Sequence, residues 1–475
     1  MKNKSKKIKM LKKQVQGITL IALVVTIIVL LILAGVAISL TVGDNGLFRR
    51  AQNAADTYEQ ASKKEKIELA IGSTFLDETG DFSITKSKLE NALRGEFGND
   101  TEISVEENGD GSFLITIDNK NEYYVGEDGE LIDSSNMIKI STADELKAFK
   151  DDVNSGNTFE GKYVYLANDI TLDINEEWEP IGYYSQDTES AEKVLENENN
   201  KPFSGIFDGH GHTINNMYIN TSNVGQGFFG LVINGEIKNI NIAENCSINT
   251  GGILGSVVGY MYNTGKISGC KNYANLDKAS GGIVGSIAGS ITVSDCINYG
   301  DIQNGFGGVV GSSNGTDWEE FANVHHTLIN CANYGIINRT DSIDYVGGIA
   351  GYFKGNILNS FNLGNIVAKR NNVGGIVGEI TGNANNCYNI ADITGSGNVG
   401  GIAGCLTGSL INCYTIANIT ANYSVGTFYG YGTIATKENC YSKNDEFTAS
   451  DLGDAFEEDT ENINQGYPIL KWQKK

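Results

Sequence analysis

A short glycine block recurs through the second half of the 475-residue chain and constrains its fold more than any other feature. In most copies two glycines flank two apolar residues, as in Gly282-Ile283-Val284-Gly285. The copies end at Gly230, Gly255, Gly285, Gly311, Gly351, Gly378, Gly404 and Gly430. Their ends are 25, 30, 26, 40, 27, 26 and 26 residues apart, so the base unit has 26 residues. The step of 40 indicates an insertion of about 14 residues, which we place around 315–327.

Each unit contains three short extended segments separated by Gly, Asn and Ser. In the unit 374–399 these segments are 375–380, 385–389 and 391–394. Three strands of this length make one coil of a parallel β-helix, and stacking on neighbouring coils buries the apolar face. A helical solenoid is disfavoured because apolar residues at helical spacing are lacking. The sequence therefore predicts a mainly β fold, a right-handed parallel β-helix (β-solenoid).

Cysteine and asparagine follow the same period. One cysteine column is predicted, with Ser360 replacing Cys in one unit and Cys405 outside it: Cys246, Cys270, Cys296, Cys331, Cys387, Cys413 and Cys440. An asparagine often follows two residues later: Asn272, Asn298, Asn333, Asn362 and Asn389. Residues i and i+2 share a strand face, so both types should stack in columns. One cysteine per coil, without a CxxC motif, favours reduced structural thiols; disulfides are the alternative in an exported protein.

The N-terminus has the pattern of a membrane segment. Seven lysines and no acid occupy residues 1–17, and the uncharged apolar run Ile18–Val42 follows. A helix of 25 residues spans about 37 Å, more than the roughly 30 Å of bilayer hydrocarbon. The lysines predict a cytoplasmic N-terminus and an extracellular, cell-surface bulk of the chain. The net charge of −23 argues against a nucleic-acid partner.

This leader and apolar run resemble the start of a type IV prepilin or pseudopilin. The residues that carry the resemblance are Lys12-Lys13-Gln14-Val15-Gln16-Gly17 and the following Ile18–Val25. The resemblance implies that a prepilin peptidase cuts between Gly17 and Ile18. Ala22 stands where that family usually has Glu, which puts filament assembly in doubt. A plain signal anchor and a cleaved secretory signal are the alternatives.

The repeats resemble the GLUG-motif repeats of bacterial surface and adhesin-like proteins, including regions of IgA-protease-type polypeptides. The resemblance covers about residues 225–445 and includes the block glycines. Thr142 and Glu145 are spaced as a capping box before the first coils. The predicted divisions are a basic cytoplasmic leader 1–17, a transmembrane helix 18–42, a stalk helix 43–71, a small α+β module 72–135, an N-terminal cap with first coils 137–224, GLUG-type repeats 225–445 and a C-terminal cap 446–475.

Candidates for chemistry are few. Asp208, His210 and His212 form the densest titratable cluster, but Gly209 and Gly211 favour a tight structural turn over a metal site. Acids in the repeats are scattered rather than paired, as a hydrolase requires. Lys369, Arg339 and Arg370 are isolated candidates for a lyase base. No HExxH motif occurs, so protease activity is not carried over from the resemblance. No cofactor or metal is expected.

The sequence thus predicts a non-catalytic binding or adhesion protein. We place the candidate binding loop in the insertion, because loops on rigid scaffolds concentrate binding residues: Trp318, Phe321, His325 and His326. Expected partners are membrane lipid, a surface carbohydrate or a host or cell-surface protein, and a prepilin peptidase with pilus or secretion assembly proteins. A minor pseudopilin and a polysaccharide-active β-helix enzyme remain alternatives.

Overall fold

The computed structural model describes residues 27–29, 47–74, 84–107, 112–119, 121–126, 129–185, 194, 197–220, 225–249, 253–313 and 326–474. They fall into two compact units that divide between Asp133 and Ser134. The predicted span 18–42 lies outside the described residues except for 27–29, and Gly17 and Ile18 lie outside them entirely. In the described part of the chain, no helix combines the length and apolar character that crossing a bilayer requires.

The first unit is a small α+β module. Its elements are the helices α2 (Leu47–Thr74) and α3 (Lys86–Phe97) and one antiparallel sheet of β1 (Ile103–Glu107), β2 (Phe113–Ile117), β3 (Asn121–Val125) and β4 (Leu131–Asp133). The predicted hairpin and the two short strands after it are confirmed. The C-terminal part of α2 belongs to the core of this module, because Ile67 and Ile71 cluster with Leu89 and Leu93 of α3. The C-terminal turns of α2 therefore pack within the module.

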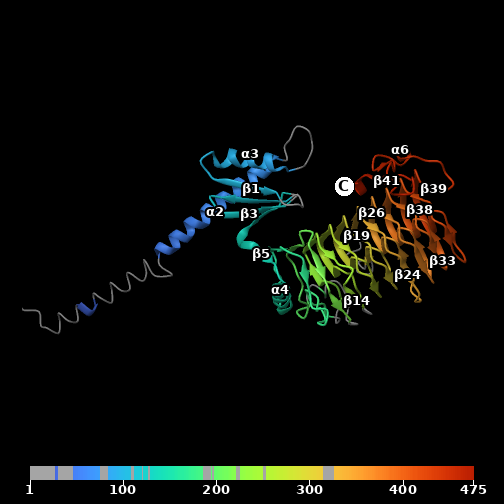
Figure 1. Ribbon diagram of the computed structural model, residues 1–475, viewed down its shortest axis with the longest axis horizontal. Helices are drawn as coiled ribbons and strands as arrows, with labels where there is room; N and C mark the ends of the chain where they lie inside the picture. Colours follow the sequence, from blue (N-terminus) through green and yellow to red (C-terminus); the bar gives the residue numbers. More distant parts are fainter. Residues whose placement is uncertain are drawn as a thin grey trace, which may run out of the picture. The chain divides into compact units, whose positions relative to one another are not determined.

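The second unit is a parallel β-solenoid, and its strands form four sheets that run along the stack (Figure 1). Sheet 1 has 13 strands, namely β5 (Met137–Ile140), β6 (Tyr163–Leu166), β8 (Ile206–Asp208), β11 (Phe229–Ile233), β12 (Glu236–Lys238), β15 (Val258–Ser268), β18 (Val284–Ser294), β21 (Val310–Ser313), β22 (His326–Ile329), β26 (Ala350–Leu358), β30 (Val377–Asn385), β34 (Ala403–Ile411) and β38 (Tyr429–Glu438). Sheet 2 has ten, namely β7 (Ile170–Thr171), β9 (Thr213–Asn215), β13 (Asn241–Ile242), β16 (Lys271–Asn272), β19 (Ile297–Asn298), β23 (Ala332–Asn333), β27 (Phe361–Asn362), β31 (Tyr388–Asn389), β35 (Tyr414–Thr415) and β39 (Tyr441–Ser442). One strand of sheet 2 per coil gives about ten coils.

Two shorter sheets complete the coils. Sheet 3 has eight strands, namely β10 (Tyr218–Ile219), β14 (Ser247–Asn249), β17 (Leu276–Asp277), β20 (Ile302–Gln303), β24 (Ile337–Arg339), β28 (Ile366–Ala368), β32 (Ile393–Thr394) and β36 (Ile419–Thr420). Sheet 4 has four, namely β25 (Val346–Gly347), β29 (Asn371–Gly374), β33 (Gly397–Gly400) and β37 (Val425–Gly426). The prediction of three strands per coil missed sheet 4. It also began the second strand at Asn385, which is the last residue of β30.

The register between coils shows where the extra residues of the long repeat lie. Ile302 pairs with Ile337, a step of 35 residues, whereas Gly307 pairs with Gly347, a step of 40. The extra length therefore divides into about nine residues before Ile337 and about five between Ile337 and Gly347. The prediction of a single 14-residue insertion around 315–327 is wrong, because a second loop interrupts the same coil.

The two ends of the solenoid are finished differently. Helix α4 (Ala143–Ser155) follows β5, and its Leu146, Phe149 and Val153 join the solenoid core. The predicted capping box is present, with the Glu145 backbone N–H donating to Thr142 Oγ1 and the Glu145 carboxylate accepting from the Thr142 N–H.

The C-terminal segment, 445–474, contains α6 (Ala449–Leu452), β40 (Phe456–Glu457), β41 (Ile469–Leu470) and the 3-10 helix η3 (Lys471–Lys474). Its apolar residues pack on aromatic side chains of sheet 2 along the side of the stack. The last strand of sheet 1, β38, remains largely exposed. The prediction of a cap closing the C-terminal end is therefore wrong.

Candidate functional site

The block glycines are structural, and they form two columns along the stack. A Cβ on Gly311 would come 2.4 Å from the Gly285 carbonyl oxygen, and one on Gly351 would come 2.6 Å from that of Gly311. Gly378 and Gly404 meet the same limit. Only glycine allows the backbones to approach this closely.

The sequence pattern groups Gly255 with Gly285 and Gly311, but the register places Gly255 in the second glycine column, with Gly281. Val258 pairs with Val284, so the equivalent of Gly285 is Gly259 rather than Gly255. A Cβ on Gly255 would instead meet the Val258 carbonyl oxygen at 2.4 Å, as a Cβ on Gly281 would meet that of Val284. The sequence Gly252-Ile253-Leu254-Gly255 imitates the repeat four residues too early.

The predicted asparagine column is confirmed as a hydrogen-bonded ladder. The side-chain amide of each residue donates to the side-chain oxygen of the next, from Asn272 through Asn298, Asn333 and Asn362 to Asn389, at 2.7–2.8 Å. Each Nδ2 also donates to the carbonyl two residues later in its own coil. All five are fully buried, so the ladder satisfies polar groups that would otherwise be costly inside the core.

The cysteine column is also present, and its thiols are free. The Cys296, Cys331, Cys387 and Cys413 Sγ atoms donate to the carbonyl two residues earlier at 3.1–3.4 Å. Ser360 makes the same bond to Leu358 at 2.7 Å, which explains why serine fits there. Cys246 is an exception to the predicted column, because its coil neighbour is Met217, whose N–H donates to the Cys246 sulfur.

The thiols have no sign of activation. Burial raises the pKa of Cys246 to about 11 and that of Cys331 to about 12. Burial also raises the pKa of Cys296 and Cys413 well above the usual range. A nucleophilic cysteine needs a lowered pKa and access to substrate, so these residues act as packing groups.

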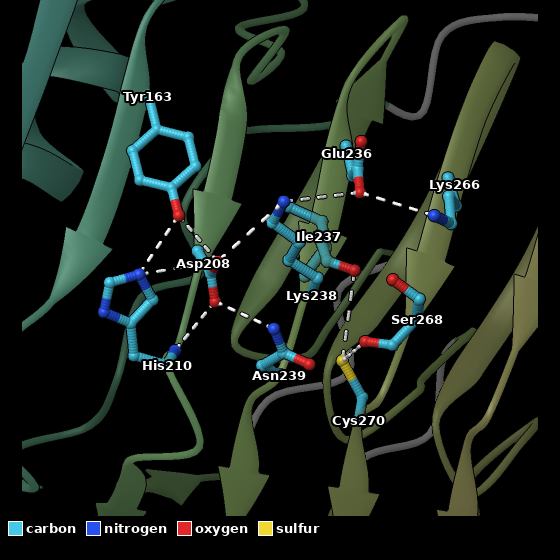
Figure 2. A network of polar contacts seen from close by, with 10 residues as sticks. All are labelled: Tyr163, Asp208, His210, Glu236, Ile237, Lys238, Asn239, Lys266, Ser268 and Cys270. Carbon is cyan, nitrogen blue, oxygen red and sulfur yellow. Dashed lines mark hydrogen bonds and ion pairs between the residues drawn. The ribbon is translucent and has the colours of Figure 1, made fainter. Parts of the chain in front are cut away.

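The densest polar cluster surrounds Asp208, and we call it the Asp208 cluster (Figure 2). Asp208 is fully buried on β8. It accepts hydrogen bonds from the Tyr163 hydroxyl at 2.7 Å, the His210 backbone N–H at 2.8 Å and Asn239 Nδ2 at 3.1 Å. The His210 Nε2 lies 3.0 Å from the Tyr163 hydroxyl, and Lys238 Nζ lies 3.8 Å from the carboxylate. The cluster ties together three successive strands of sheet 1.

Opposite charges alternate across these coils. Asp208 pairs in register with Lys238, and Glu236 pairs in register with Lys266. Glu236 Oε1 lies 3.9 Å from both Lys238 Nζ and Lys266 Nζ. Cross-strand pairs of opposite charge stabilise a sheet. The sequence analysis missed Glu236, Lys238 and Tyr163. An acid and a base about one repeat apart, as in Asp208 and Lys238, could have indicated the charged residues among them.

The tight turn expected at Gly209 and Gly211 is present, and it separates the two histidines. His210 has φ of +49° and Gly211 has φ of +75°. The His210 ring stacks on Tyr165 with centroids 5.1 Å apart, whereas His212 Nδ1 lies 3.1 Å from Asp169 Oδ1. The described residues contain no group of three or more His, Cys, Asp or Glu arranged to hold a metal ion.

The candidate groups for polysaccharide cleavage are buried or already hydrogen-bonded. A glycosidase needs two carboxyl groups that both reach the sugar, and Asp208 is inaccessible. Arg339, a candidate lyase base, is 2% exposed, binds Asp341 through Nε at 2.7 Å and packs 3.8 Å from the Phe306 ring centroid. Arg370 Nε donates to the Ser342 carbonyl and joins no second catalytic group in the contacts of the described residues.

The predicted binding loop is only partly within the described residues. Trp318, Phe321 and His325 lie outside them. His326 does not lie on a protruding loop: it is the first residue of β22, is 2% exposed and has its ring 6.0 Å from that of Phe353. Its assignment to the loop is wrong, because β22 begins at His326, two residues before the position 328 that follows the predicted insertion.

Comparison with known proteins adds little. No family model matches the chain, and no curated protein matches it. Among solved structures, the chain is similar to a "putative immunoglobulin A1 protease" from Bacteroides ovatus, at 19% identity and a TM-score of 0.44. The match covers 71% of this chain and 93% of the other. A similarity at this level assigns no activity to the chain.

Proposed function

We propose that the chain is a membrane-anchored, cell-surface protein whose β-solenoid is a non-catalytic scaffold for binding or adhesion. One observation carries the proposal: in the described part of the solenoid, clustered and buried titratable groups hold coils together, while the outer face presents exposed side chains. The Asp208 cluster and the buried thiols are examples of the first. Exposed tyrosines after the strands of sheet 2 are examples of the second.

The remaining features of the proposal come from the sequence. The apolar run Ile18–Val42 anchors the chain in membrane lipid, and a prepilin peptidase cuts between Gly17 and Ile18. The coils wind in the right-handed sense, which about 98% of parallel β crossovers adopt. The repeats belong to the GLUG type, and the partner is a surface carbohydrate or a protein of a host or another cell.

Protease treatment of intact cells that express the full chain tests the surface location. The proposal expects fragments of the solenoid to be released while the N-terminal leader stays with the cell. Complete protection of the solenoid until the cells are lysed would contradict it. Mass spectrometry of the mature N-terminus tests cleavage separately, since a chain that still begins at Met1 excludes processing after Gly17.

A screen of the purified chain against polysaccharides tests the non-catalytic assignment. No new reducing ends and no unsaturated products are expected. If products appear, the Asp208→Asn variant identifies whether the Asp208 cluster generates them. Loss of that activity in a folded variant would replace the binding role with an enzymatic one.

A further inference from the structure

The outer face of sheet 2 carries two neighbouring columns of aromatic side chains, two residues apart in register, and the chain itself covers one of them. In the covered column, Phe361, Tyr388 and Tyr414 stack with centroids 5.0 and 4.7 Å apart and ring planes within 5°. The C-terminal segment lies on them. The hydroxyl of Tyr388 donates to Gln473 Oε1 at 2.9 Å, that of Tyr414 donates to the Pro468 carbonyl, and Trp472 Nε1 donates to the Asn359 carbonyl at 2.8 Å.

The other column is open along its first three coils. Tyr273, Tyr299 and Tyr334, which we call the tyrosine ladder, stack with centroids 4.8 and 4.9 Å apart and ring planes at 5° and 16°. They are 41%, 38% and 38% exposed. Main-chain hydrogen bonds between coils fix their spacing, since the Tyr299 N–H donates to the Asn272 carbonyl and the Tyr334 N–H to the Asn298 carbonyl.

The two columns touch each other. The Tyr334 ring meets the Phe361 ring edge to face, with centroids 5.7 Å apart. A surface that begins at Tyr273 therefore runs without interruption into the surface that the C-terminal segment already occupies. That segment shows what such a surface holds: a peptide that accepts tyrosine hydroxyls at the Pro468 carbonyl and at Gln473 Oε1 and that packs an aromatic side chain, Trp472, beside them.

The orientation of the rings separates a peptide from a sugar. Sugars stack on the open faces of aromatic rings, but the faces inside the tyrosine ladder are used by the neighbouring tyrosines. The central ring, Tyr299, is stacked on both faces, so its exposed surface consists of ring edge and hydroxyl. Tyrosine hydroxyls are protonated at neutral pH and can donate, and burial raises the pKa of Tyr334 further, to about 12. Hydroxyl donors beside aromatic surface suit peptide carbonyls, as in the recognition of proline-rich segments.

We propose that the tyrosine ladder, Tyr273, Tyr299 and Tyr334, is a docking site for an extended peptide segment of a partner protein. The tyrosine hydroxyls donate to main-chain carbonyls of the peptide, and an aromatic or proline side chain packs against the ring edges. The ladder spans about 10 Å, which about three extended residues cover. This proposal rests on the proposed binding role and names the class of partner.

Fluorescence anisotropy with the purified full chain in detergent tests the proposal. The probe is a labelled synthetic peptide with the sequence of residues 464–474, Asn-Gln-Gly-Tyr-Pro-Ile-Leu-Lys-Trp-Gln-Lys. Saturable binding is expected, and Tyr299→Ala should weaken it at least about tenfold because it removes the centre of the ladder. Tyr299→Phe keeps the stacking and should weaken binding only a few-fold. Tyr431→Ala, at a 64% exposed tyrosine on β38, should leave it unchanged.

Three outcomes would overturn the proposal: no binding of the peptide, equal binding by the Tyr299→Ala and unaltered chains, or equal binding of a scrambled peptide. If Tyr299→Ala fails to fold, Tyr273→Ala at the end of the ladder replaces it. Soluble β-glucan is the second probe. Glucan binding that Tyr299→Ala abolishes would exclude the peptide and keep the binding role, whereas polysaccharide cleavage would exclude the binding role itself.

Discussion

Each end of the solenoid has to protect its core and its unpaired strand edges, and the two ends do so in different ways. At the N-terminal end, α4 covers the core with Leu146, Phe149 and Val153. At the C-terminal end, β38 is exposed, and the column of Ile357, Ala384 and Leu410 continues with Lys437. The Lys437 ammonium lies 4.9 Å from the Phe428 ring centroid. One end is closed by apolar burial, and the other by a charge on the core position.

A register shift adds to the protection of the C-terminal end. The pairing of β34 with β38 shifts between Gly408 and Ser409, so β38 carries one extra residue there. Bulges and inward-pointing charges are the means by which natural sheets discourage further pairing at an edge. A solenoid therefore needs a covered core at one end only, provided that the other end cannot accept another strand.

The largest expected effect is at the covered end. Phe149→Ala should destabilise the solenoid by about 3–5 kcal/mol, because Phe149 is buried and packs on Phe159 and Phe203. Tyr431→Ala at the open end should change stability by less than about 0.5 kcal/mol. Urea unfolding followed by circular dichroism measures both. Equal losses at the two ends would remove the distinction between them.

Between the ends, the asparagine ladder should show a position effect. Asn333→Thr breaks the ladder in its middle and leaves buried partners unsatisfied, at a cost of about 1–3 kcal/mol. Asn389→Thr only shortens it toward the C-terminal end, where Thr415 already occupies the next position, and should cost less. Denaturation midpoints of the two variants compare them directly. A larger loss for Asn389→Thr would contradict a continuous ladder.

Alkaline pH should weaken the whole stack. The buried thiols have pKa values raised to about 11 in Cys246 and about 12 in Cys331, against 9.0 as the ordinary value. Their contribution is complete below pH 9 and is lost as the pH rises toward the folded values, because the unfolded chain releases these protons first. Urea midpoints should therefore fall between pH 9 and pH 11, and less steeply for Cys331→Ser. A slope unchanged by that substitution would show that other groups cause the loss.

A small effect on folding, and a new effect on association, are expected at Lys437. Lys437→Leu completes the apolar column at the open end, so copies should associate through their exposed edges while stability changes by less than about 1 kcal/mol. Sedimentation velocity detects the association. Lys443→Leu removes the same charge from a turn on the same coil and should stay as unassociated as the original chain. Association of both variants would mean that loss of a positive charge, rather than its position in the core column, causes the copies to associate.

Repeated side-chain chemistry made the stack predictable, and local variation limited the rest. Asn272 and Asn298 recur with the same neighbours, so the period revealed their column. Gly255 was misplaced because an imitation of the repeat stands four residues from the true position of Gly259. Sheet 4 was missed because its strands, such as Asn371–Gly374, are short and contain one apolar residue.

The candidate site was predicted less well than the fold. Asp208 and His210 attracted attention as a titratable cluster, but their partners Tyr163 and Lys238 come from other coils. Only the register between coils brings these residues together, and a period of 26 does not give the register in the longer first coils. The course of the C-terminal segment along sheet 2 likewise depends on tertiary packing of Trp472, which no local pattern encodes.

Cross-linking across the insertion tests the central claim, a parallel stack in this register, most directly. Thr292 of β18 pairs with Thr327 of β22, although 35 residues separate them in the chain. Neighbouring strands lie about 4.8 Å apart, within reach of a disulfide. The double variant Thr292→Cys, Thr327→Cys should form that disulfide on mild oxidation, as peptide mapping by mass spectrometry detects. If Thr292→Cys cross-links instead to Ile329→Cys in a parallel variant, or neither pair forms, the register and the stack built on it are wrong.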